Sequence, residues 1–289
     1  MPATVPTPPE QPRMITLEPG LTSQLSPRVR RIIAPNPGVM TGPGTNTYLL
    51  GNDAIAVVDP GPDEPSHIDA ILREGAGRIR WILVTHTHED HSPAATPLAR
   101  ATGAELRGVA APDDFYQDLI FRPDVDLAVQ PLLQTPEFNL RAVHTPGHAC
   151  NHYCLLLEEE GMLFTGDHIM NGSTVVIIPP SGDMKDYLDS LEKLKALPLR
   201  SLAPGHGELM PEPMAVVDGI IRHRLNREAK VAKILAAAGG TLDELVERAY
   251  DDVPRVMFPM AKYSLWAHLL KLAREGRAVE SGGRWEPPG

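Results

Sequence analysis

The sequence predicts a mixed α/β domain with covered sheets, followed by a smaller helical unit that ends in a hairpin. Short apolar strands alternate with turns and helical segments through the first two thirds of the 289 residues. From residue 214 onward, apolar residues recur at helical spacing instead. The charge divides at about the same place, because residues 220–289 hold 12 basic and 9 acidic residues, whereas the rest of the chain has a net charge of −13.

The first part contains seven segments with the length and composition of strands, each followed by turn residues. We predict strands at residues 47–50, 54–58, 79–84, 140–144, 152–157, 162–164 and 201–202. Helices are expected at residues 67–73, 94–102 and 184–197, and the last has four leucines on one face. Strands and helices mixed in this order favour an α/β fold whose sheets are covered by helices.

The last part has the outline of a winged helix. A long helix is expected at residues 214–238, between Pro211 and the pair Gly239-Gly240. Thr241 and Glu244 form a capping box for a second helix, a third follows at 260–275, and residues 277–286 suggest a hairpin. We therefore predict a flexible tail at 1–15, a catalytic domain at 16–215 and a winged-helix-like domain at 216–289.

Composition and charge exclude several classes of protein. With 42% apolar and 22% charged residues, the chain matches an ordinary globular enzyme rather than a disordered, collagenous or disulfide-scaffold protein. A net charge of −10 gives no basic footprint for duplex DNA, and no apolar run approaches the roughly 20 residues of a membrane span. The proline-rich start lacks the apolar region of a signal peptide. We expect a cytoplasmic protein, with Cys150 and Cys154 as reduced core thiols.

Four turns that each follow a predicted strand carry metal-binding side chains. The first is His86-Thr87-His88-Glu89-Asp90-His91, in which the alternation of an extended chain directs His86 and His88 the same way. The others are the sequences TPGH, TGD and PGHG, which end the strands near residues 144, 164 and 202. Imidazole and carboxylate groups suit zinc, and also iron or manganese. The pattern predicts two adjacent metal ions.

The order of these four motifs resembles that of the metallo-β-lactamase-fold hydrolases, over residues 45–207. The resemblance implies an αββα sandwich with a dinuclear site. Carried over by position, His86, His88 and His148 would hold one metal ion. Asp90, His91 and His206 would hold the other, and Asp167 would bridge the two.

The sequence GPGTNTYLL at 42–50, the segment that leads into the long helix and the winged-helix end together resemble the lactamase-beta-2-like subgroup. That subgroup includes a single-stranded-RNA endoribonuclease and thioesterases that act on carrier proteins. For the chemistry we expect two zinc ions and attack by a hydroxide that bridges them. Asp90 would orient the water and take its proton, and His168 could serve as a general acid if it faces the cleft rather than the core.

The remaining conspicuous polar residues are assigned lesser roles. Asp59 is expected to support the metal-binding loops, with a turn cap as the alternative. His144 and His152 would orient ligands or be hydrogen-bonded in the interior. Three further histidines are expected in solvent: His67, His223 and His268.

Two substrate classes remain open at this point. We favour cleavage of single-stranded RNA, because the net +3 C-terminal unit could place a strand across the cleft, although the acidic body repels polyanions. The alternative is hydrolysis of an acyl thioester, ester or lactone, with β-lactam hydrolysis as a side activity. A regulatory winged-helix protein with a vestigial site is disfavoured because all seven ligands are present. The expected partner is thus a small-molecule or acyl substrate or single-stranded RNA, and a homodimer is left open.

Overall fold

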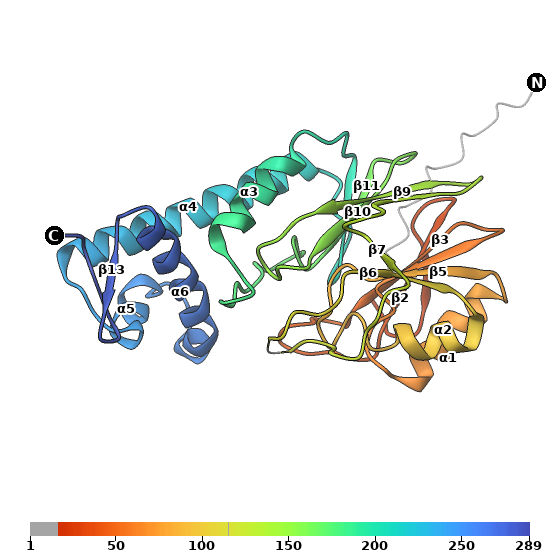
Figure 1. Cartoon of the computed structure of the whole chain (residues 1–289), viewed down its shortest axis with the longest axis horizontal. Coiled ribbons are helices and arrows are strands. Elements are labelled where there is room, and N and C mark those ends of the chain that lie inside the picture. The colour runs from red at the N-terminus through yellow and green to blue at the C-terminus, as the bar shows by residue number, and fades with distance from the viewer. Residues whose placement is uncertain (1–16, 115) are drawn as a thin grey trace, which may run out of the picture.

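The computed structural model describes residues 17–114 and 116–289, so the tail predicted at 1–15 lies outside the described residues. Two sheets lie face to face with helices outside them, and a helical unit extends from one side (Figure 1). This arrangement confirms the predicted αββα sandwich with a C-terminal winged helix.

The first sheet has seven strands in sequence order. Antiparallel pairs join the first four strands, and parallel pairs join β4 through β7. Helices α1 (Pro65–Gly75) and α2 (Ala95–Thr102) pack on its outer face, where Ile71 and Leu98 meet Ile82. The strands are β1 (Thr22–Gln24), β2 (Val29–Ile33), β3 (Asn46–Leu50), β4 (Ile55–Val58), β5 (Ile79–Leu83), β6 (Glu105–Gly108) and β7 (Val125–Asp126).

The second sheet has the order β12-β11-β10-β9-β8. Tyr48 from the first sheet packs against Phe164 from the second, with ring centroids 4.9 Å apart, in the core between the two sheets. Helix α3 (Met184–Leu194) covers the outer face through Tyr187 and Leu191. The strands are β8 (Leu132–Gln134), β9 (Asn139–His144), β10 (Tyr153–Leu157), β11 (Met162–Gly166) and β12 (Ser201–Pro204).

The C-terminal unit is joined to the sandwich by the long helix α4 (Pro213–Ala237), which Figure 1 shows running from one to the other. Val217 near its start packs in the core under α3, whereas Leu235 near its end packs with Trp285 in a separate core. The predicted boundary after residue 215 therefore falls in the first turn of a continuous helix.

The rest of this unit follows the predicted order of helices and hairpin. Helix α5 (Leu242–Ala249) begins with the capping box of Thr241 and Glu244. A 3-10 turn η1 (Arg255–Met257), helix α6 (Phe258–Arg274) and the strands β13 (Val279–Ser281) and β14 (Arg284–Glu286) complete it. Among the described residues, no helix is both long and apolar enough to cross a membrane.

Several predictions about single side chains were wrong. His67 and His268 were expected in solvent but are 1% and 0% exposed, because the strands beside α1 and the core of the C-terminal unit cover them. His223 is exposed as expected. Both cysteines are free, but only Cys154 is buried; Cys150 lies in the exposed turn before β10 rather than in the core.

Candidate metal centre

The four predicted metal-binding turns meet at one edge of the sandwich. One follows β5, and the others follow β9, β11 and β12. The turns can approach one another this closely because two of them contain glycine, which has no Cβ. A Cβ at Gly147 would lie 2.3 Å from Cα of Tyr187, and a Cβ at Gly205 would lie 2.7 Å from Oδ1 of Asp167. Both glycines are thus required by space, and Gly147 also has a positive φ of 140°, a conformation that favours glycine.

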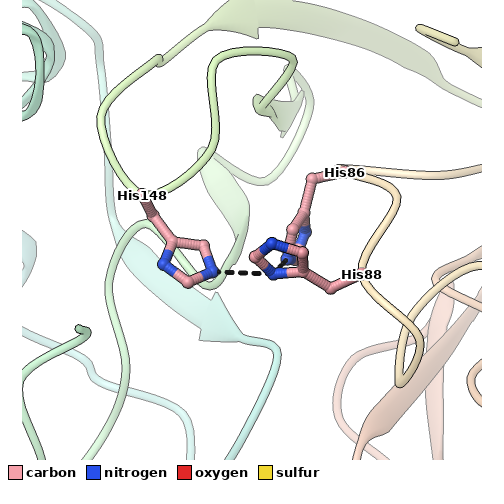
Figure 2. A group of neighbouring side chains, drawn as sticks. All are labelled: His86, His88 and His148. Atoms are coloured by element: carbon pink, nitrogen blue, oxygen red, sulfur yellow. Dashed lines mark hydrogen bonds between the residues drawn. The ribbon is translucent and has the colours of Figure 1, made fainter. Parts of the chain in front are cut away.

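Three histidines form the first group of the site. Nδ1 of His88 lies 3.0 Å from Nε2 of His86 and 3.0 Å from Nε2 of His148. Figure 2 shows the three rings pointing toward one another, two from one segment and His148 from another. Burial lowers the pKa of all three, to about 3 for His88. The group therefore presents neutral imidazoles, the form that binds a metal ion.

The second group combines two histidines with two carboxylates. Nε2 of His206 lies 3.1 Å from Oδ2 of Asp90 and 3.3 Å from Oδ1 of Asp167. Nε2 of His91 lies 3.5 Å and 3.3 Å from the same two oxygens. Four potential ligand atoms thus surround one point.

The electrostatics of the second group favour a cation. Burial lowers the pKa of His91 and His206, but the carboxylates of Asp90 and Asp167 outweigh it, raising the pKa of His206 to about 9 and that of His91 well above its ordinary value. Burial raises the pKa of Asp167, whereas the two histidines bring it well below its ordinary value. Two negative carboxylates beside two imidazoles match a divalent cation in charge.

Buried polar atoms without a hydrogen-bond partner indicate whether the two groups fit metal ions. Nε2 of His91, Nε2 of His206 and Oδ1 of Asp167 are buried and have no hydrogen-bond partner among the described residues. Buried polar atoms without partners are rare unless a ligand satisfies them. The other oxygen of Asp167, Oδ2, lies 3.9 Å from Nε2 of His148, so this carboxylate faces both groups. The residues present therefore fit two ions with Asp167 between them.

Neighbouring groups fix the orientation of the imidazoles. Oδ2 of Asp59 lies 3.1 Å from Nδ1 of His91, and its carboxylate also accepts hydrogen bonds from the backbone and hydroxyl of Thr85, both at 2.8 Å. The predicted supporting contact of Asp59 is therefore present.

Backbone carbonyl groups orient two further histidines. Nδ1 of His148 lies 2.8 Å from the carbonyl oxygen of Val176, and Nδ1 of His206 lies 3.3 Å from the carbonyl oxygen of Gly44. Each of these contacts, like that of Asp59 with His91, leaves Nε2 of the ring directed at the centre.

The other histidines of this region differ in position. His152 is buried, its Nδ1 lies 2.9 Å from Oγ1 of Thr145, and its ring centroid is 5.0 Å from that of His86. His144 is exposed and lies against Cys150, so it does not support a ligand. His168 is 0% exposed and packs against Tyr187. It lines neither of the two cavities that open from the centre, which are described below. The position of His168 therefore does not support the predicted role as general acid.

Two cavities open from the centre, and His148 and Asp167 line both. The first, which we call the mouth cavity, has a volume of about 490 Å³ and is lined by Met40, Tyr116 and Ile178, and by Met260 and Tyr263 of α6. The second, the inner cavity, has a volume of about 450 Å³ and lies between the segment after β11 and the C-terminal unit. The C-terminal unit thus forms part of the wall of both.

Sequence reasoning missed the residues that shape these cavities. Met40 lies in a loop without a ligand motif, and Arg224 lies on α4, the helix that follows the last ligand motif, and is not itself part of any ligand motif. The nearest signal was the pair Arg224 and Arg227, three residues apart and so on one face of a helix.

Comparison with known proteins identifies two family matches. The family described as "Metallo-beta-lactamase superfamily" matches residues 40–206, and the "Beta-lactamase associated winged helix domain" matches residues 241–285. The chain is 32% identical to the "Beta-lactamase-like protein 2 homolog" of Drosophila melanogaster over 91% of this chain and 93% of the relative. It is 33% identical to the "Atrochrysone carboxyl ACP thioesterase" of Aspergillus fumigatus over 80% and 76% of the two chains.

Solved structures resemble the chain in fold. A beta-lactamase domain protein from Burkholderia ambifaria gives a TM-score of 0.77 at 20% identity and covers 96% of both chains. A metallo-beta-lactamase family protein from Thermus thermophilus gives 0.75 at 22% identity, covering 91% of this chain and 100% of that one. The likeness extends over the sandwich and the C-terminal unit together.

Proposed function

The chain belongs to the metallo-beta-lactamase superfamily, a superfamily of hydrolases, and we propose that it is a dinuclear metal enzyme that cleaves an acyl thioester or ester. The observation that carries the choice of substrate is the lining of the mouth cavity. One part of its wall is apolar, with Met40, Tyr116, Ile178, Met260 and Tyr263, and among the described residues no lysine or arginine lines it. An uncharged acyl group suits such a wall.

The same lining disfavours RNA, the substrate that the sequence alone favours. The mouth cavity carries the carboxylates of Glu89 and Asp114 beside those of the centre, so a phosphodiester backbone would meet negative charge there. In the C-terminal unit, Trp285 is 4% exposed and offers no surface for base stacking, which leaves Tyr263, 38% exposed, as the aromatic side chain of this unit that lines the mouth cavity. The relative named as a carrier-protein thioesterase supports the acyl assignment.

The seven residues of the two groups would hold the metal ions, with zinc favoured by the imidazole and carboxylate donors and iron or manganese as alternatives. Two such ions would supply a water of lowered pKa and a Lewis acid for the acyl oxygen. Asp90 is the proposed proton acceptor, because its side chain is 28% exposed and lines the mouth cavity while Oδ2 contacts His206. The apolar part of the mouth cavity's wall would hold the acyl group and exclude bulk water from it.

The test combines metal analysis with a substrate panel. The purified chain would be assayed with an acyl thioester, an ester, a lactone, a β-lactam and unstructured RNA, before and after chelation. We expect about two ions per chain and thioester or ester hydrolysis that chelation abolishes and metal restores. Asp167→Ala should remove both metal and activity, whereas Asp189→Ala, an exposed aspartate on α3, serves as the matched control and should change neither.

Three outcomes would contradict the proposal. Less than one metal ion per chain would exclude a dinuclear enzyme. Acyl hydrolysis that chelation leaves unchanged would exclude the metal-dependent chemistry. Chelator-sensitive RNA cleavage without acyl hydrolysis would replace the acyl assignment with the ribonuclease alternative.

A further inference from the structure

The inner cavity differs from the mouth cavity in its charge. It reaches the metal centre at His148, Asp167 and His206, and its far wall comes from α4, α6 and the loop between α5 and α6. Two arginines of α4, Arg224 and Arg227, line that far wall. A substrate attacked at the metal centre could therefore extend into a compartment that contains positive charge.

The two arginines are not equivalent. Arg227 donates to both carboxylate oxygens of Asp252, at 2.7 and 2.8 Å, and lies over the ring of Tyr250 at 4.3 Å. Its charge is thus neutralised by a bidentate pair. Arg224 is 4% exposed, and no carboxylate of the described residues forms an ion pair with its guanidinium within 4.0 Å.

The carboxylate nearest to Arg224 along the helix has other partners. Glu228 lies one turn further along α4, but its oxygens lie 2.8 Å from Nζ of Lys271 and 2.9 Å from Nη1 of Arg277. Two cations of the C-terminal unit thus balance this carboxylate. The charge of Arg224 is left without a counter-ion among the described residues.

The hydrogen bonding of Arg224 is incomplete as well. One Nη donates to the carbonyl oxygen of Val175, and the guanidinium carbon lies 5.3 Å from the ring centroid of Tyr187. Its Nε is buried and has no partner among the described residues. A buried cation without a counter-ion is unfavourable, so buried charges in folded proteins are paired or bind a ligand.

We propose that Arg224 is an anion-recognition residue of the substrate site, and that the inner cavity takes the part of the substrate that carries a carboxylate or a phosphate. This inference rests on the proposed function, since it concerns an acyl thioester or ester cleaved at the centre. Such an anion has two sources: a carboxylate at the far end of the acyl group, or a phosphate in a phosphopantetheine leaving group. A planar guanidinium binds either one through parallel hydrogen bonds.

A purely structural role for Arg224 makes a different prediction. Val175, which Arg224 contacts, precedes Val176, whose carbonyl oxygen contacts Nδ1 of His148. If Arg224 served only to hold this segment, its loss would slow charged and neutral substrates by the same factor. If it binds an anion, its loss removes the preference between them.

The experiment therefore measures preference in matched substrate pairs with the metal-loaded chain. The first pair shares a neutral N-acetylcysteamine leaving group and differs only at the far end of the acyl chain, carboxylate against methyl ester. The second pair shares a neutral acyl group and has pantetheine or 4′-phosphopantetheine as leaving group. We expect kcat/KM to favour the charged member of one pair by roughly tenfold to a hundredfold, the range of a hydrogen bond to a charged group, and the pair that shows it identifies the source.

Arg224→Met should reduce that preference to about one, and Arg224→Lys should keep part of it, because a lysine retains the charge without the planar fork. Arg222→Met, which removes the same charge from the exposed face of α4, is the matched control and should keep the full preference. Calorimetry with a dicarboxylate and the corresponding monocarboxylate gives a second readout. Wild type and Arg222→Met should favour the dicarboxylate fully, Arg224→Lys in part, and Arg224→Met not at all.

The outcomes separate this inference from the proposed function. Hydrolysis of the neutral substrates alone, with no preference in either pair, would overturn the anion site and leave the acyl hydrolase standing. A preference that persists in Arg224→Met would also overturn it. Absence of hydrolysis with every substrate would contradict the proposed function. In that case calorimetry still tests the anion site, because equal binding of the dicarboxylate and the monocarboxylate to wild type would overturn it.

Discussion

Removing the carboxylate of Asp59 should weaken both the fold and the metal centre. In Asp59→Ala, three groups lose their acceptor: the backbone N–H of Thr85, its hydroxyl and Nδ1 of His91. Each buried group left without a partner costs about 1–3 kcal/mol, although the Thr85 hydroxyl also lies 3.0 Å from Nδ1 of His86 and can redirect there. With two groups left without a partner, we therefore expect a loss of roughly 2–6 kcal/mol in the free energy of unfolding.

The effect on the metal centre follows from the contact with His91. Without Asp59, the ring of His91 is no longer held with Nε2 toward Asp90 and Asp167. Loss of such an orienting partner typically weakens metal affinity by about 10- to 100-fold. Asp59→Asn should fall between the two proteins, because an amide keeps one acceptor for Thr85 but loses the charge beside His91.

Urea unfolding followed by circular dichroism, with and without chelator, measures the first effect, and a competitive metal chelator titration measures the second. Asp53→Ala, in the exposed loop before β4, is the control and should change the free energy of unfolding by no more than about 0.5 kcal/mol. An Asp59→Ala protein with the stability and metal affinity of the wild type would refute the reasoning.

Two further predictions concern backbone space and pH. In Gly147→Ala the new Cβ would lie 2.3 Å from Cα of Tyr187, so we expect loss of bound metal and a lower melting temperature; Gly77→Ala, where φ is also positive but no atom lies within 4 Å, should cost only about 1–2 kcal/mol. Equal melting temperatures for the two variants would contradict this. Burial raises the pKa of Glu228, but the neighbouring side chains of His268, Lys271 and Arg277 lower it to about 2. The contribution of Glu228 to stability is therefore complete above its ordinary pKa of 4.5 and declines as the pH falls toward about 2. The melting temperature of Glu228→Gln should thus fall less steeply than that of the wild type over this pH range. Equal slopes for the two proteins would contradict the stabilising role of the Glu228 carboxylate.

The ligand residues of the centre could be predicted because each is local to a motif. His86 and His88 follow a strand, and the alternation of side chains along that strand fixes the direction of both. Asp167 follows Gly166, and the turn at this glycine fixes the direction of the Asp167 side chain. The long strands with apolar runs and the capped helices were predictable for the same reason. Each motif fixes the direction of its own ligand side chains over a few residues, and the fold then brings the four motifs together.

Features that depend on distant partners were not predictable. Strands β1, β7 and β8 are three residues or fewer and gain their stability from sheet neighbours, and β2 carries Arg31, a buried cation that pairs with the distant Glu208. His67 and Arg224 are buried by elements far away in the sequence. Periodicity reports the face of a helix, but it does not report which segment will cover that face.

The central claim is tested most directly by titrating metal into the chelated chain while following hydrolysis of a neutral acyl thioester. The account predicts no hydrolysis without metal, a rise in activity that reaches its plateau at about two equivalents of zinc, and no recovery in Asp167→Ala. Hydrolysis that persists without metal, or a chain that binds two equivalents and leaves the thioester intact, would contradict it.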